Sequence, residues 1–129
     1  MLEEVSEAGV RYKSAEQLSL ELEDIPQTYI LCGHSHVYRS IYLPCGKHII
    51  NAGSVGLPAY DDEWPHPHVM ESLTPLAEYV IMNRMPDQPL WQIEHVSVSY
   101  DWDAASQLAL SHGREDYAYS IRTGRALMK

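Results

Sequence analysis

The sequence predicts an α+β domain in which β-hairpins come first and helices last. Short runs rich in strand-forming residues, bounded by proline or glycine, fill residues 28–98. Apart from a short helix near the start, helical spacing of apolar residues appears in the last third of the chain. Strands followed by helices indicate an α+β arrangement or a layered sheet with terminal helices. A chain of 129 residues has the length of one domain, so we expect residues 1–129 to form a single domain.

The first predicted element is a short helix over residues 14–22. Ser14 opens it and Gln17 stands three positions later, the spacing of a capping box. Pro26 ends it. Residues 28–32 then combine aromatic and branched apolar side chains between a proline and a glycine, which predicts a buried strand.

Two β-hairpins are predicted further along the chain. Residues 37–43 and 47–51 are strand-like runs separated by Pro-Cys-Gly, and residues 77–83 and 90–98 are separated by a turn rich in proline. Between the hairpins, prolines punctuate residues 59–75 and predict one long loop. Loops of this length in a compact domain are usually functional or disordered.

Two helices close the predicted fold. The first begins with Asp101 or Asp103 as its cap and ends at Gly113. The second covers residues 116–123 and ends at Gly124. It directs Tyr117 and Ile121 toward a core, with Tyr119 as an open alternative.

Composition excludes several classes of protein. The formal net charge is −9 and the nine basic residues are scattered, which argues against binding a nucleic-acid backbone. No apolar run is long enough to span a membrane, and the first residues are acidic where a signal peptide is basic. We therefore expect a soluble, cytoplasmic protein, with Cys32 and Cys45 as small buried side chains and no disulfide.

The segment Ile-Leu-Cys-Gly-His-Ser-His, residues 30–36, carries the clearest chemistry. It places an apolar strand directly before Gly33 and two histidines, His34 and His36. The glycine is expected to permit a sharp turn, and a strand end holds side chains rigidly. Neutral imidazole is a common metal ligand. By spacing alone, two ordinary loop histidines remain the alternative.

The wider context of this segment resembles a known family. Cys-Gly-His-Ser-His, a hairpin, and then Ile-Asn-Ala-Gly-Ser-Val-Gly-Leu-Pro resemble the C-terminal motifs of calcineurin-like metallophosphoesterases. The runs PAYDDEWPHPHVME and VSYDWDAA…GREDYAYSIRTGR are similar to a bacterial branch near YfcE-like and diadenosine-tetraphosphatase-like enzymes. The resemblance covers residues 28–125, and Ala52 departs from the proline of many members.

This resemblance implies a two-sheet β-sandwich flanked by helices, part of a four-layer α/β/β/α fold. It also implies a binuclear centre of divalent Mn, Fe, Zn or Ni ions that hydrolyses phosphomonoesters or phosphodiesters. His36 would bind the first metal and His34 the second. The adjoining loop would be structural, through Gly33, Asn51, Gly53 and Gly56.

Ser54 and His68 each have two alternative roles. Ser54 either approaches substrate or has a structural role. His68 lies in a Pro-His-Pro-His run and either contacts substrate from a lid or belongs to a solvated loop. His48, His95 and His112 are interpreted as surface or packed histidines, and Arg39 as an exposed strand arginine.

The rest of the family's metal site is missing from this sequence. Members also need an Asp-x-His, a Gly-Asp, a Gly-Asn-His-Asp/Glu and another histidine, and the 33 residues before His34 contain none of these. We therefore expect the C-terminal portion of such a domain, inactive alone, that self-associates or is completed by the missing N-terminal half. The alternatives are a non-catalytic dimerising or binding module, and a mononuclear metal protein using His34, His36 and His66 or His68.

Overall fold

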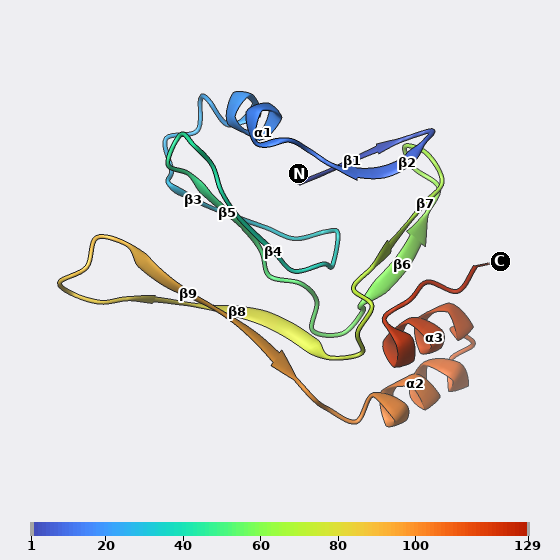
Figure 1. The fold of residues 1–129 in the computed structure, drawn as a ribbon. Helices are drawn as coiled ribbons and strands as arrows, with labels where there is room; N and C mark the ends of the chain where they lie inside the picture. Colours follow the sequence, from blue (N-terminus) through green and yellow to red (C-terminus); the bar gives the residue numbers. More distant parts are fainter. Residues whose placement is uncertain (1, 129) are drawn as a thin grey trace.

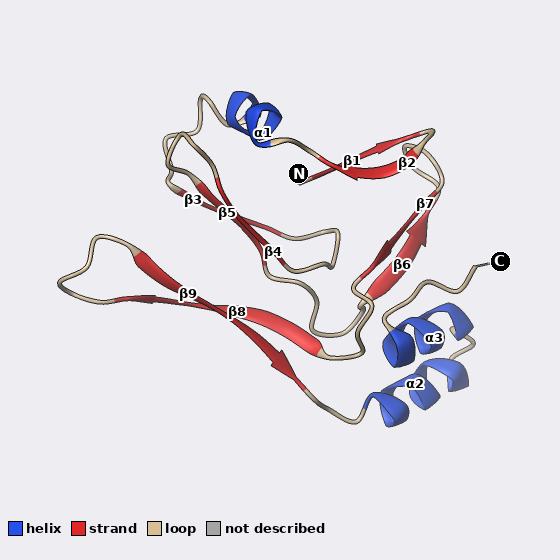
Figure 2. Ribbon diagram, in the orientation of Figure 1, coloured by secondary structure: helices blue, strands red, loops and turns tan. Residues whose placement is uncertain are grey.

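The computed structural model describes residues 2–128 and has the expected α+β class (Figures 1 and 2). Its elements in chain order are β1 Glu3–Ser6, β2 Gly9–Tyr12, α1 Ala15–Glu21, β3 Tyr29–Cys32, β4 Arg39–Tyr42, β5 His48–Asn51, β6 Ala59–Asp62, β7 His68–Glu71, β8 Ala77–Arg84, β9 Trp91–Val98, α2 Trp102–Ser111 and α3 Glu115–Thr123. The strands form one three-stranded sheet and three two-stranded hairpins.

The N-terminal hairpin of β1 and β2 was not predicted. Its strands are four residues each and pair antiparallel from Glu3 opposite Tyr12 to Ser6 opposite Gly9. The predicted helix that follows is confirmed as α1. Ser14 Oγ accepts from the Gln17 amide at 3.2 Å and Gln17 Oε1 accepts from the Ser14 amide at 3.1 Å, which completes the capping box.

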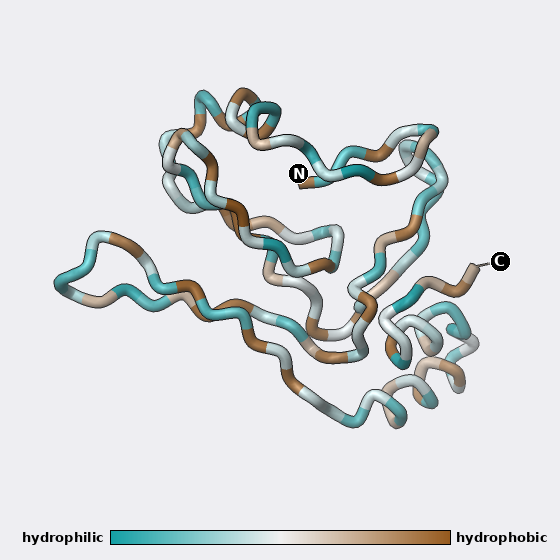
Figure 3. Tube along the Cα trace, in the orientation of Figure 1, coloured by the Kyte–Doolittle hydropathy of each residue, from teal (hydrophilic) through white to brown (hydrophobic). Residues whose placement is uncertain are grey.

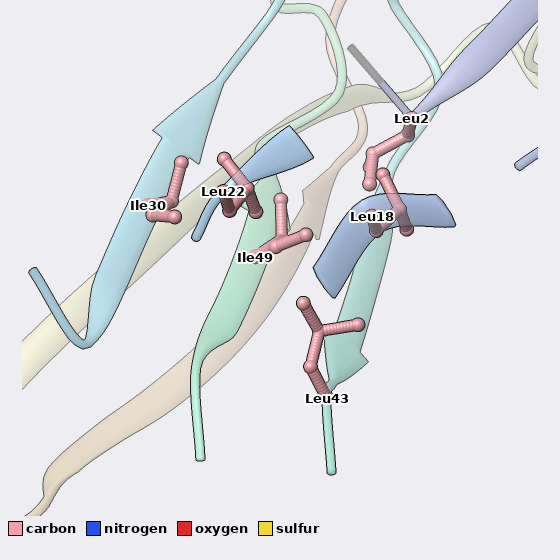
Figure 4. Close-up of a cluster of buried hydrophobic side chains, with 6 residues drawn as sticks. All are labelled: Leu2, Leu18, Leu22, Ile30, Leu43 and Ile49. Atoms are coloured by element: carbon pink, nitrogen blue, oxygen red, sulfur yellow. The ribbon is translucent and has the colours of Figure 1, made fainter. Parts of the chain in front are cut away.

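The three-stranded sheet lies at the centre of the fold in the order β3-β5-β4. β5 pairs parallel with β3 and antiparallel with β4, so the predicted strand and the first predicted hairpin are confirmed. All four residues of β5 are buried. Figure 4 shows the core cluster where α1 packs on this sheet, which consists of Leu2, Leu18, Leu22, Ile30, Leu43 and Ile49. Each such side chain contributes about 1.5–3 kcal/mol on burial.

The single long loop predicted for residues 59–75 is wrong. Residues Ala59–Asp62 and His68–Glu71 form the antiparallel hairpin β6–β7, with Met70 and Ala59 buried. The prolines that suggested a loop lie outside the paired residues. Pro65 and Pro67 lie in the connection, where they interrupt no ladder hydrogen bond.

The C-terminal third follows the prediction closely. β8 and β9 pair over eight residues, and the Tyr29 hydroxyl of β3 accepts from the Trp91 amide at 3.0 Å. Asp101 caps α2 by accepting from the Ala104 amide at 2.9 Å. Ser106 Oγ of α2 donates to a carbonyl of α3 at 2.8 Å, which joins the two helices.

Helix α3 is held against the β6–β7 hairpin by buried polar contacts. Ser120, 2% exposed, hydrogen-bonds the backbone amide and carbonyl of Ala59. Gly124 ends the helix with φ 68°, and a Cβ there would stand 2.2 Å from the Thr74 amide nitrogen. Of the predicted inward-facing residues, Ile121 is buried whereas Tyr117 is 38% exposed.

Large apolar side chains remain at the surface. Leu31 is 63% exposed, Val55 67% and Trp64 80%, and Figure 3 shows apolar residues along chain segments outside the core. Cys32 is half-buried, but Cys45 is exposed and so contradicts the prediction, because it lies in the tight turn between β4 and β5. None of the described helices is long and apolar enough to cross a membrane.

Candidate functional site

The two predicted metal histidines lie at the carboxyl end of the central sheet. β3 ends at Cys32, whose partner in the parallel ladder is Asn51, the last residue of β5. The turn that carries His34 and His36 and the loop that follows Asn51 therefore leave the sheet side by side. Ligand sites in sheets of parallel strands gather at this edge.

The turn bends at the histidines themselves. His34 has φ 77° and His36 φ 60°, both in the left-handed region that side chains disfavour. Gly33 is not in this region, and a Cβ there would meet nothing within 4 Å. The expected role of Gly33 is therefore wrong, because the histidines carry the unusual backbone angles. Left-handed backbone at a residue with a side chain costs about 1–2 kcal/mol, so surrounding bonds must hold this turn.

Asn51 provides several of those bonds. It is fully buried, and its Nδ2 donates to the Gly33 carbonyl at 3.2 Å and to Ser35 Oγ at 2.8 Å. Its Oδ1 accepts from the Gly53 amide at 3.1 Å. One amide side chain thus joins the histidine turn to the following loop.

That loop in turn orients His36. Ser54 Oγ accepts from the Leu57 amide at 3.0 Å and bends the loop, and the Leu57 carbonyl lies 2.6 Å from His36 Nδ1. A carbonyl only accepts, so Nδ1 carries a proton and the Nε2 of neutral His36 holds a lone pair. Metal-bound histidines commonly use this arrangement. The contacts of Ser54 are structural, and Ser54 does not line the cleft described next.

Gly53 and Gly56 follow Asn51 in the same loop, but only one of the two positions requires glycine. Gly53 has φ 81°, and a Cβ there would stand 2.8 Å from Glu78 Cβ, so this position requires glycine. Gly56 does not have a positive φ, and a Cβ added there would have no neighbour within 4 Å. The backbone therefore explains the glycine at position 53 but not at position 56.

His34 and His36 both line one cleft of about 350 Å³. Its walls come from the β3–β4 turn, strand β6, the start of α3 and the segment after α3. Besides the histidines, its polar and aromatic lining consists of Tyr60, Asp61, Asp62, Arg114, Asp116 and Tyr117. Carboxylates, imidazoles and one guanidinium therefore share a single space.

Arg114 and Asp116 form a fixed ion pair at this cleft. Arg114 Nε and Nη2 donate to the two carboxylate oxygens of Asp116 at 2.9 and 2.7 Å, and the guanidinium stacks 3.4 Å from the centroid of the Tyr117 ring. The hydrogen bond from Arg114 lowers the pKa of Asp116 to about 2. Sequence reasoning missed both residues, because an i, i+2 pair at a helix start is common on surfaces.

Tyr60 stands among three histidines. Its ring centroid lies 4.9 Å from that of His36, 6.0 Å from His34 and 6.4 Å from His68. Burial raises the pKa of the Tyr60 phenol, and the charges of Asp62 and Glu3 add to the effect. The hydroxyl therefore stays protonated and can donate a hydrogen bond into the cleft at neutral pH.

His68 lies beside the main cleft and outside its lining. Its Nδ1 lies 2.8 Å from the His66 carbonyl, and it borders a second cavity of about 240 Å³ that His34, Glu3 and Tyr60 also line. The structure therefore places His68 on the β6–β7 hairpin and not on a long loop, and His68 lines one cavity with His34.

In the described part of the chain, His34 and His36 do not belong to a larger group of side chains that could hold a metal ion. Within residues 2–128, no group of three or more His, Cys, Asp or Glu side chains is arranged to hold an ion, with or without His66 and His68. The orientation of His36 fits a ligand, but catalytic metal sites use three or more protein ligands. These residues alone do not build a complete centre.

His48 and His95 have structural partners elsewhere in the fold. His48 is 2% exposed, with Nε2 2.6 Å from Ser40 Oγ. His95 stacks on Tyr38 at 3.6 Å between ring centroids, and its Nε2 lies 3.2 Å from Glu78 Oε1.

His112 and Arg39 lie outside the lining of the cleft. His112 is exposed at the end of α2, as interpreted. Arg39 is half-buried rather than exposed, because its guanidinium stacks 3.5 Å from the centroid of the Tyr12 ring of the unpredicted hairpin.

Comparison with known proteins leaves the family open. The chain matches no known protein-family model, and no curated protein matches it.

Proposed function

We propose that this chain provides the two-histidine part of a divalent-metal centre in a calcineurin-like phosphoesterase. The observation that carries the proposal is the shared cleft of His34 and His36, with His36 Nδ1 bound to the Leu57 carbonyl so that Nε2 is free. A parallel strand pair followed by a hairpin, with α1 on one face, is compatible with part of that family's sandwich. The reaction is hydrolysis of a phosphomonoester or phosphodiester once the centre is complete.

The remaining ligands come from polypeptide outside residues 2–128, either of the same protein or of another chain. Within residues 2–128 no group of three or more candidate ligands is arranged to hold an ion, so a complete centre requires ligands from elsewhere. Mn, Fe, Zn and Ni are all compatible with imidazole ligands. In such a centre His36 binds the first ion and His34 the second, while Arg114 and Tyr60 face the space beside them.

The test combines metal analysis with turnover of generic chromogenic phosphate esters in added Mn²⁺. We expect no turnover by the chain alone, and weak Mn²⁺ binding that is lost in His34→Ala and His36→Ala. His112→Ala is the matched control, because His112 is exposed on α2 and outside the cleft. Mn²⁺ binding that is unchanged in the double variant would contradict the proposal. Turnover that depends on both histidines would support the phosphoesterase activity but refute the proposal that the centre needs ligands from elsewhere.

A second candidate function is a non-catalytic module that associates with itself or a partner. The exposure of Leu31, Val55 and Trp64 favours it. Within residues 2–128, β3 pairs with β5 only, so its other edge can accept a strand. Sedimentation velocity tests this second function: association that Leu31→Glu abolishes supports a module, and a monodisperse monomer contradicts it.

A further inference from the structure

Ser35, which separates the two histidines, is the most enclosed residue of the turn. It is 3% exposed, its Oγ accepts from Asn51 Nδ2 at 2.8 Å, and it lies 3.0 Å from Glu3 Oε1. An amide nitrogen only donates and a carboxylate only accepts. The single hydroxyl hydrogen of Ser35 is therefore committed to Glu3, and the direction of both bonds is fixed.

Glu3 reaches this turn from the unpredicted N-terminal hairpin. It lies in β1, 32 residues before Ser35. The preceding Leu2 is fully buried in the core cluster beside Leu18 (Figure 4), and the Lys13 amide donates to the Leu2 carbonyl at 3.0 Å. The carboxylate is thus attached to an anchored strand.

We infer that Glu3 is a positioning residue for the histidine pair and acts through Ser35. The inference rests on the proposed function, because it concerns how His34 and His36 come to face one cleft. Both flanking histidines have left-handed backbone, and such a turn relaxes unless its centre is held. Asn51 holds Ser35 from the sheet and Glu3 holds it from the hairpin. We expect the release of Ser35 to move His36 away from the Leu57 carbonyl, which lies 2.6 Å from its Nδ1.

Glu3 acts through the serine and is not itself a ligand. It borders the second cavity with His34 and His68, but no group of three ligand side chains forms there within residues 2–128. Its carboxylate instead accepts the hydrogen bond from Ser35. Residues that hydrogen-bond a metal ligand commonly change metal affinity by about 10–100-fold when they are replaced, and Glu3 stands one contact further from the histidines.

The first readout needs no metal. The His36 Nδ1 proton, bonded to the Leu57 carbonyl, gives a slowly exchanging imidazole N–H resonance in the proton NMR spectrum. We expect this resonance to disappear in Glu3→Ala and to persist in Glu3→Gln, whose amide oxygen still accepts from Ser35. Glu4→Ala is the matched control, because it removes the same charge from the same strand and Glu4 pairs with Arg11 instead.

The second readout is the Mn²⁺ dissociation constant. We expect it to rise about tenfold in Glu3→Ala, the low end for residues that orient ligands, and less than about twofold in Glu3→Gln and Glu4→Ala. Where Glu3→Ala unfolds the hairpin, Ser35→Ala breaks the same link without replacing any residue of β1 or β2, although it also removes the acceptor for Asn51 Nδ2. An imidazole resonance that persists in folded Glu3→Ala or Ser35→Ala overturns the inference. A wild-type protein that binds no Mn²⁺ refutes the proposed function, while the imidazole resonance still decides the role of Glu3.

Discussion

Asn51→Asp tests whether one buried amide holds the histidine turn. The substitution keeps the shape of the side chain and its acceptor for the Gly53 amide, but removes both donors to Gly33 and Ser35. Each lost hydrogen bond contributes about 1 kcal/mol, and a buried carboxylate facing two acceptors adds about 2 kcal/mol. We therefore expect the free energy of unfolding to fall by about 4 kcal/mol near neutral pH.

The same variant has a pH dependence of known sign. Asn51 is fully buried, so the introduced carboxyl is favoured in its protonated form and its pKa in the folded protein lies above the ordinary value of about 3.9. The unfolded chain loses this proton first, so stability falls as pH rises from about 4. The deficit relative to wild type is therefore smaller near pH 4, where the protonated carboxyl donates one bond.

Urea unfolding followed by circular dichroism, at both pH values, measures these differences. Asn51→Ala is the matched control, because it removes all three bonds and introduces no titratable group. We expect its deficit to be about 3 kcal/mol at each pH, from three lost bonds of about 1 kcal/mol each. If Asn51→Asp is as stable as wild type near neutral pH, the amide does not hold the turn.

Three further predictions concern single contacts. Gly53→Ala is destabilising by about 2–4 kcal/mol and Gly46→Ala by about 1 kcal/mol, because both have positive φ but only Gly53 faces Glu78; equal effects in thermal unfolding would contradict this. NMR titration of the Asp116 carboxyl gives a pKa of about 2 that returns toward 4 in Arg114→Gln, so its stabilising contribution is present above about pH 4 and lost as pH falls toward 2. Burial lowers the pKa of His48, so the folding stability that neutral His48 contributes is present above about pH 6.5 and lost as pH falls further. His48→Gln abolishes that part of the loss of stability in acid, and a pH profile of stability that is unchanged in the variant refutes the prediction.

Local signals in the sequence predicted much of the fold. The capping box at Ser14 and the helix caps at Asp101 and Gly124 depend on neighbours within four residues, so the sequence contains the whole interaction. The two predicted hairpins likewise follow from contiguous strand-forming runs. The β6–β7 hairpin was missed because its prolines lie between two strands of only four residues, a length at which pattern is weak evidence.

The candidate site depends on contacts that the sequence does not display. The resemblance of the segment around His34 and His36, and not their spacing alone, predicted a metal site. Nothing in the sequence predicted which residues hold the two histidines in place. Glu3 lies 32 positions before Ser35, and Arg114 comes to the cleft from the start of α3. Such partners are set by how distant elements pack, and a single sequence contains no periodicity that reports this. The expectation that Gly33 permits the sharp turn is wrong for a related reason, since His34 and His36 have the left-handed backbone angles instead.

The central proposal is that His34 and His36, which line one cleft, both supply ligands to a divalent-metal centre. Its most direct test is titration of the chain with Mn²⁺ while the histidine ring resonances are followed by NMR, because the paramagnetic ion broadens the nearest rings first. We expect the His34 and His36 signals to broaden together at the lowest Mn²⁺ concentrations, before those of His95 and His112. Early broadening of His66 and His68, with His34 and His36 still sharp, would contradict the claim.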